Sequence, residues 1–115
     1  MDELKIWIVV RNDLKMPTGK LLAQAGHAVA STMVIAGAER VTEYMSHNQP
    51  KIAVKVKNLL ALERTYKEAT DAGLPCAFIV DEGRTVFGEP TPTVVGIGPC
   101  YYVDLPKFVQ RLQLL

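Results

Sequence analysis

Four polar side chains recur at intervals of three or four residues in an otherwise apolar stretch that ends at Gly37. They are Lys20, Gln24, His27 and Ser31. At about 100° per residue, these positions fall within roughly 60° of one another around a helix axis and form one narrow stripe. A helix that is apolar on its other faces is largely buried, so a polar line on it must face a cleft or hydrogen-bond partners. The stripe is therefore the first candidate for a functional site.

The start of this helix is predicted to attract an anion. Thr18 is a suitable N-cap, and Gly37 provides a C-terminal stop after Ala36. Lys20 then lies in the first turn, where a cation opposes the helix dipole at a cost of about a few tenths of a kcal/mol. The dipole, the free N–H groups after Gly19 and the ammonium group all favour negative charge. Any one of these residues alone is explained more simply by solvation or packing, but the aligned set favours a site.

The remaining elements follow from hydrophobic periodicity and turn residues. Apolar runs predict strands at Leu4 to Arg11, Lys51 to Lys57, Pro75 to Val80 and Thr93 to Ile97, the last ended by Gly98-Pro99. Helical patterns cover 38–45, the segment that Asn58 caps and Gly73 ends, and a last helix capped by Asp104 with Phe108, Val109 and Leu112 on its buried side. The lysines of the second strand share one face, which suits an RNA-facing patch or, more commonly, a soluble edge strand.

The connections between these elements predict the topology. Helical crossovers join the first three strands, which are therefore expected to be parallel, whereas a loop without a helix favours an antiparallel fourth strand. The expected α/β fold is a mixed four-stranded sheet with helices on both faces. The start of the long helix then lies beyond the carboxyl end of the first strand, and Asp81 lies beyond that of the third. This is the edge where open α/β sheets bind ligands. The side chains expected to converge there are Lys20, Gln24, His27, Asp81, Thr85 and Thr93.

Composition limits the classes of function. The 115 residues suit one domain, 1–115, and a net charge of +1 means that any RNA contact must come from a local basic patch. Cys76 and Cys100 lack metal-ligand spacing and are interpreted as reduced packing residues. The N-terminus resembles neither a signal peptide nor a membrane span, so no membrane partner and a cytoplasmic location are expected.

Short motifs along nearly the whole chain resemble the type 2 peptidyl-tRNA hydrolase family in order and spacing. They are Gly19-Lys20, Ala23-Gln24, His27-Ala28, Gln49-Pro50-Lys51, Asp81-Glu82-Gly83-Arg84-Thr85 and the run from Thr93 to Pro99. The resemblance implies a three-layer α/β/α fold and cleavage of the ester between a peptide and the 3′ end of tRNA. It implies peptidyl-tRNA as the partner, no metal or organic cofactor, and a possible homodimer.

Carried over by position, the important residues of the family fall on the same six side chains that the topology brings together. As a hypothesis, Lys20 stabilises the oxyanion, Asp81 or His27 is the general base, and Gln24, Thr85 and Thr93 orient water and substrate. The cations to be tested first for phosphate contacts are Arg11, Lys15, Lys51, Lys55 and Arg84. Tyr101 or Tyr102 could stack on a base, although ordinary packing explains them more simply. The chain departs from the family pattern at Met16-Pro17-Thr18, at Glu82 and after Gly98.

Two other interpretations stay open. The nearly neutral charge is compatible with a non-catalytic module of the same fold that binds a tRNA end or a protein. A small hydrolase that acts on another ester or amide is the third possibility, and it predicts activity that is insensitive to salt.

Overall fold

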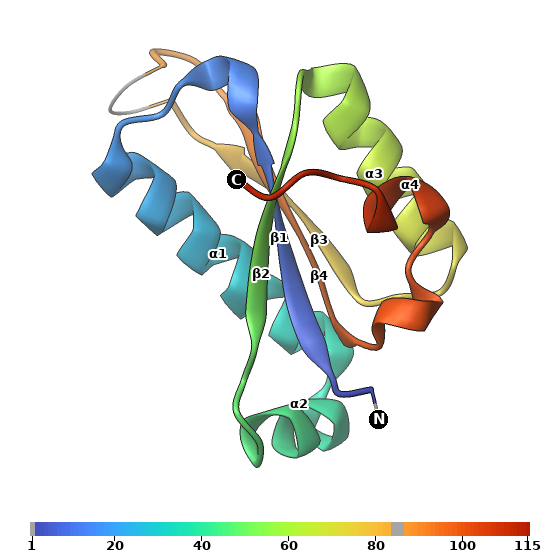
Figure 1. Ribbon diagram of the computed structural model, residues 1–115. Helices are drawn as coiled ribbons and strands as arrows, with labels where there is room; N and C mark the ends of the chain where they lie inside the picture. Colours follow the sequence, from blue (N-terminus) through green and yellow to red (C-terminus); the bar gives the residue numbers. More distant parts are fainter. Residues whose placement is uncertain (1, 84–86) are drawn as a thin grey trace.

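The protein is built on a mixed four-stranded sheet. The structure, a computed structural model, describes residues 2–83 and 87–115. The strands are β1 (Lys5–Arg11), β2 (Lys51–Val56), β3 (Cys76–Asp81) and β4 (Thr91–Cys100), in the order β2-β1-β4-β3 (Figure 1). Strands β1 and β2 are parallel, and β4 runs antiparallel to both of its neighbours, β1 and β3. The predicted mixed sheet with an antiparallel last strand is confirmed.

Helices cover both faces of the sheet. Helices α1 (Thr18–Ala36) and α2 (Ala38–Met45) lie on one face, and α3 (Leu59–Asp71) and α4 (Lys107–Gln110) lie on the other (Figure 1). Alternate residues of β1 pack against the two helical layers. Ile6 packs near Tyr44 of α2, whereas Trp7 and Val9 pack in the cluster that holds Leu62 of α3. This period of two is the reason why the strand is apolar throughout. The three-layer α/β/α arrangement agrees with the expectation.

The ends of α1 and α3 agree with the predicted capping residues, except at the start of α1. The predicted N-cap of α1 is wrong, because Pro17 occupies the cap and Thr18 is already helical. The carbonyl of Pro17 accepts the N–H of Leu21 at 2.9 Å, so the helix starts one residue earlier than the Thr18 side chain suggests. Gly37, at a φ of 91°, ends α1 as predicted. The side chain of Asn58 accepts the N–H of Ala61 at 3.0 Å and caps α3, also as predicted.

Two predictions for the C-terminal part are wrong. Strand β4 does not end at Gly98-Pro99 but continues to Cys100, which pairs with Lys5 after a shift of register. Gly98 makes this possible, because it adopts a φ of 113° and a Cβ there would lie 2.5 Å from the carbonyl oxygen of Lys5. Asp104 caps no helix, since it lies in a 3-10 helix (Tyr102–Asp104) and α4 begins after Pro106. The predicted buried side of this segment is confirmed, with Phe108, Val109 and Leu112 in or against the core.

The C-terminal segment covers part of the outer edge of β2. The N–H of Lys55 donates to the carbonyl of Gln113, and the N–H of Leu115 donates to the carbonyl of Ala53, both at 3.0 Å. Strand β2 is an edge strand, and this segment pairs with part of its outer side.

Close backbone contact fixes α1 against the sheet. A Cβ on Gly96 of β4 would lie 2.6 Å from the carbonyl oxygen of Ala28, so only glycine allows this approach. One turn further along, the hydroxyl of Thr32 donates to the carbonyl of Gly98 at 2.7 Å. These contacts hold the helix that carries the polar stripe at a defined height above β4.

Both cysteines are buried and unpaired, as predicted. Burial raises the pKa of each thiol to about 12. Neither thiol is therefore ionised near neutral pH. Among the described residues, no helix is long and apolar enough to cross a membrane.

Candidate functional site

An ion pair joins the start of α1 to the end of β3. The ammonium nitrogen of Lys20 lies 2.6 Å from Oδ1 of Asp81. Their side chains are only 13% and 10% exposed, respectively. Asp81 is the last residue of β3, at the carboxyl edge of the sheet. The cation that opposes the helix dipole thus has a local reason, because its charge is matched by a carboxylate from another element.

Gln24 connects this ion pair to β4. Its amide Nε2 donates to Oδ1 of Asp81 at 3.2 Å, and its Oε1 accepts from the hydroxyl of Thr93 at 2.6 Å. Gln24 is 3% exposed and Thr93 is completely buried. The hydroxyl of Thr93 has a single proton, which it donates to Gln24. The carbonyl of Ile79, 3.4 Å away, is a weaker alternative acceptor. The two hydrogen bonds of Gln24 orient its amide, with nitrogen toward Asp81.

The second oxygen of Asp81 is held by backbone. The N–H of Gly83, at a φ of 82°, donates to Oδ2 at 2.9 Å and closes a local turn. The hydrogen bond from Lys20 is the main reason why the pKa of Asp81 lies below its ordinary value. Partial burial opposes this shift, whereas the Gly83 N–H and the positive charges of Lys20 and His27 add to it. Asp81 is therefore a carboxylate at neutral pH, with its orientation fixed from three directions.

His27 lies one turn beyond Gln24 on the same line of α1, and its side chain is exposed. Its charge acts on the pKa of Asp81, so the imidazole belongs to the same electrostatic environment. Exposure leaves the ring accessible to a substrate that binds over α1. The structure thus brings together Lys20, Gln24, Asp81 and Thr93 by direct contact, with His27 beside them.

Two of the predicted site residues, Arg84 and Thr85, lie outside the described residues. Arg11 ends β1 at the same edge as Asp81, where it donates to Asp13 at 3.0 Å and to the carbonyl of Pro92 at 3.1 Å. It therefore braces the start of β4 next to the site.

Lys51 is not brought to this edge. It starts β2 and pairs with Ile6 near the start of β1, at the opposite end of the sheet. Its ammonium donates to the carbonyl of Gln49 at 3.1 Å and lies 5.4 Å from the ring centroid of Tyr44. The tyrosines after β4 also lie near that end, where Tyr101 donates to Glu43 and Tyr102 packs near Trp7.

Sequence reasoning missed two participants, the N–H of Gly83 and the ring of Phe87. The ammonium of Lys20 lies 5.9 Å from the centroid of that ring. The sequence Asp81-Glu82-Gly83 carries a usable signal for the first, because aspartate two residues before glycine favours an Asx turn. Nothing in the spacing of Phe87 indicates its place. Within residues 2–83 and 87–115, no group of three or more His, Cys, Asp or Glu side chains is arranged to hold a metal ion.

This arrangement has the parts needed for hydrolysis of a polarised carbonyl. A fixed carboxylate can accept a hydrogen bond from water, an ammonium group can stabilise an oxyanion, and an accessible imidazole can take up a proton. Among the described residues, every buried side-chain polar atom has a hydrogen-bond partner. These groups are therefore held in place without an unsatisfied buried donor or acceptor.

Comparisons with known proteins agree with one another. Residues 4–115 match the family described as Peptidyl-tRNA hydrolase PTH2. The chain is 37% identical to a Peptidyl-tRNA hydrolase of Methanocaldococcus jannaschii, over 97% of this chain and 100% of that protein. It is 39% identical to one of Methanococcus maripaludis over 94% and 96% of the two chains. A Peptidyl-tRNA hydrolase of Sulfurisphaera tokodaii is 36% identical over 96% of this chain and 98% of its own.

Proposed function

The chain belongs to the PTH2 family of peptidyl-tRNA hydrolases, and we propose that its Lys20–Asp81 site cleaves the ester between a peptide and the 3′ end of tRNA. The observation that supports this site most directly is the continuous hydrogen-bonded set formed by Lys20, Asp81, Gln24 and Thr93. It joins three elements at one edge of the sheet, and its centre is a carboxylate with a lowered pKa. Such perturbed, partly buried groups are typical of functional sites.

In the proposed reaction, water attacks the ester carbonyl and no covalent enzyme intermediate forms. Asp81 orients the water by accepting a hydrogen bond from it. The ammonium of Lys20 stabilises the negative charge that develops on the carbonyl oxygen. The C–O bond to the tRNA ribose then breaks, and the 3′ oxygen leaves with the proton taken from the attacking water.

We assign the uptake of that proton to His27 rather than to Asp81. A general base works best when its pKa lies near the working pH, and Asp81 is held below even the ordinary range of a carboxyl group. Histidine is the most frequent general base, and His27 lies exposed on the same helix face. Asp81 therefore acts on orientation and charge. Thr93 acts through Gln24, by holding its amide toward the carboxylate.

The substrate contacts outside this centre stay predictions. Arg11, Arg84 and Lys51 are proposed to contact tRNA phosphates, Lys51 at a part of the substrate more distant from the ester than Arg11. Thr85 is proposed to orient substrate in the loop after Asp81. We also place the protein in the cytoplasm, where peptidyl-tRNA arises during translation, and a homodimer stays a prediction from the family resemblance.

The test is release of free tRNA from N-acetyl-aminoacyl-tRNA by the wild type and by Lys20→Ala and Asp81→Asn. We expect Lys20→Ala to lower kcat by roughly 10²-fold or more, the usual effect of losing an oxyanion donor. Asp81→Asn removes the carboxylate that orients the water and holds Lys20, and we expect a similar loss. Lys67→Ala is the matched control, because its exposed ion pair with Asp71 lies on α3. Circular dichroism and thermal unfolding establish that each variant is folded.

The alternatives make different predictions in the same experiment. A non-catalytic module would bind the substrate and leave the ester intact in the wild type. A hydrolase for another ester would neither bind nor cleave the tRNA conjugate. If the folded Lys20→Ala and Asp81→Asn variants keep the turnover of the wild type, the catalytic site lies elsewhere.

A further inference from the structure

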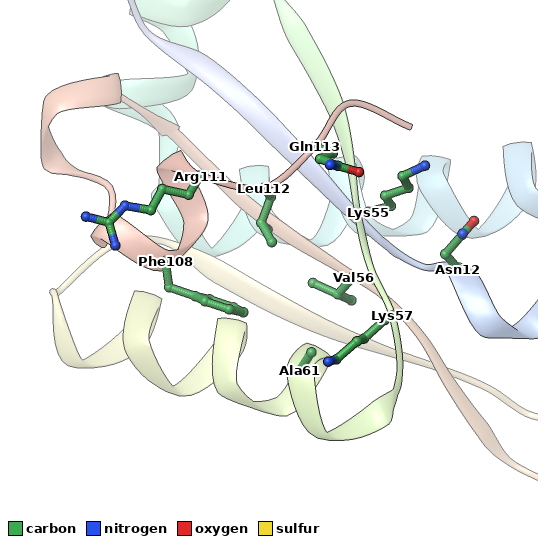
Figure 2. Close-up of a pocket in the computed structure, with 9 residues that line it drawn as sticks. All are labelled: Asn12, Lys55, Val56, Lys57, Ala61, Phe108, Arg111, Leu112 and Gln113. Atoms are coloured by element: carbon green, nitrogen blue, oxygen red, sulfur yellow. The ribbon is translucent and has the colours of Figure 1, made fainter.

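A pocket lies at the carboxyl end of β2, on the face of the sheet that α3 and α4 cover. Its apolar wall consists of Val56, Ala61, Phe108 and Leu112, which pack in or against the core of that face (Figure 2). The cavity has a volume of about 310 Å³. We name it the β2–α3 pocket. A volume of this size lies at the lower end of the range for small-molecule sites.

Three cations line the β2–α3 pocket and no carboxylate does. They are Lys55, Lys57 and Arg111. None of them forms an ion pair or a side-chain hydrogen bond with a described residue, whereas Arg64 and Lys67 nearby on α3 are paired with Glu68 and Asp71. In a chain with 13 basic and 12 acidic residues, three unpaired cations around one cavity make a local basic patch.

The pocket combines an apolar wall with charged groups at its rim. Figure 2 shows the ammonium end of Lys57 next to Ala61, and Arg111 at the opposite rim with its guanidinium pointing outward from the apolar wall. The guanidinium of Arg64 lies 3.9 Å from the ring centroid of Phe108 and supports that ring. An apolar wall with an aromatic ring accommodates a flat base, and cations at the rim attract its phosphates.

The β2–α3 pocket and the Lys20–Asp81 site lie at the same edge of the sheet. Val56 pairs with Arg11 at the end of β1, and Asp81 ends β3, three strand positions away in the order β2-β1-β4-β3. At about 4.8 Å between strands, the component of their separation along this edge is roughly 14 Å. The pocket opens on the α3 face and Asp81 contacts α1 on the other face, so an RNA strand that joins them must pass around the edge. At about 3.4 Å per stacked nucleotide, such a strand spans at least about four nucleotides.

We propose that the β2–α3 pocket binds a nucleotide of the tRNA acceptor end, with the phosphates at Lys57 and Arg111 and the base against Phe108, while the ester lies at Asp81. This inference rests on the proposed function for the identity of the RNA. It explains how a chain with a net charge of +1 can retain tRNA, because the basic charge is concentrated where the strand passes.

The test compares the double variant Lys57→Gln/Arg111→Gln with the control Lys5→Gln/Lys107→Gln, which removes the same charge outside the pocket. Losing two phosphate contacts is expected to raise KM for N-acetyl-aminoacyl-tRNA roughly tenfold and to make the log–log salt slope of binding shallower by about 1.4. The control is expected to change neither quantity. Lys57, Arg111 and Lys107 are exposed and Lys5 is half-buried, and thermal unfolding establishes that both variants are folded.

Binding to the pocket can also be measured directly, without turnover. The tetranucleotide ACCA, added to isotope-labelled protein, is expected to shift the amide NMR signals of Lys57, Ala61 and Leu112 in the wild type and in the control, but not in the double variant. Equal shifts in all three proteins, or shifts confined to the surroundings of Asp81, would overturn the proposal. So would saturation of the same signals by inorganic phosphate alone, or by N-acetylmethionine methyl ester, which would indicate a site for free anions or for the peptide.

The same data separate this inference from the proposed function. If the wild type binds ACCA through the pocket but leaves the ester intact, the pocket stands and the hydrolase assignment fails. If the wild type turns over and the double variant keeps its KM, the hydrolase stands and the pocket assignment fails.

Discussion

Lys20 and Asp81 are separated by 61 positions in the chain, yet their charged atoms lie 2.6 Å apart. This contact depends on two independent features, the position of Lys20 in the first turn of α1 and the position of Asp81 at the carboxyl end of β3. Because both groups are about nine-tenths buried, neither can lose its partner without leaving a poorly solvated charge. The ion pair therefore couples the integrity of the site to the stability of the fold.

The first prediction concerns stability in acid. The folded carboxylate of Asp81 has a lowered pKa, so it binds a proton less readily than the unfolded one. Its stabilising contribution is fully present above the unfolded pKa, about 3.9, and is lost as pH falls through the lower folded value. We expect the difference in Tm between wild type and Asp81→Asn to be constant from pH 8 to pH 5 and to shrink below about pH 4. The same difference at pH 3 and pH 7 would contradict the lowered pKa.

The pH dependence of turnover distinguishes the two candidates for the general base. If Asp81 accepted the proton, kcat/KM would stay level from neutral pH to well below pH 5, since its pKa is lowered. We assign the base to His27, so His27→Gln should lower kcat by about 10²- to 10⁴-fold. A level wild-type profile with an active His27→Gln variant would return the role to Asp81.

Gln24 and Thr93 are predicted to act as a unit. Gln24→Met or Thr93→Val alone leaves a buried polar group without its partner, which costs about 1–3 kcal/mol of the free energy of unfolding. The double variant should cost less than the sum of the two by at least about 0.5 kcal/mol, measured by urea unfolding.

The control for this cycle is Thr65→Val on α3. The hydroxyl of Thr65 is also buried and hydrogen-bonded, but its partner is the carbonyl of Ala61. Gln24→Met and Thr65→Val should therefore be additive. Additivity in the Gln24 and Thr93 pair as well would mean that the 2.6 Å contact contributes little to stability.

The site could be predicted from the sequence because two simple rules fix its members. The helical period places Lys20, Gln24 and His27 on one line, and the crossover connections place Asp81 at the edge where α1 begins. The orientation of the Gln24 amide could not be predicted, since it depends on a hydroxyl of β4 and a carboxylate of β3 that meet only in the folded chain.

One other failure has an equally local cause. Gly98-Pro99 has the composition of a strand end. Pairing of Cys100 with Lys5, a contact between distant parts of the chain, keeps it within β4.

The last prediction concerns the contact that sets the height of α1. In Gly96→Ala the new methyl group would lie 2.6 Å from the carbonyl oxygen of Ala28, and the other close atoms are the carbonyl carbon and the Cβ of Ala28, so no flexible side chain can move away. We expect a loss of about 1–3 kcal/mol in the free energy of unfolding, as for an overpacked core. Because α1 carries Lys20 and Gln24, its displacement should also lower kcat. Gly26→Ala is the matched control, since a Cβ there meets nothing within 4 Å and should stabilise the helix by about 0.5–1 kcal/mol. A Gly96→Ala variant as stable and active as Gly26→Ala would show that α1 can shift outward without disturbing the ion pair.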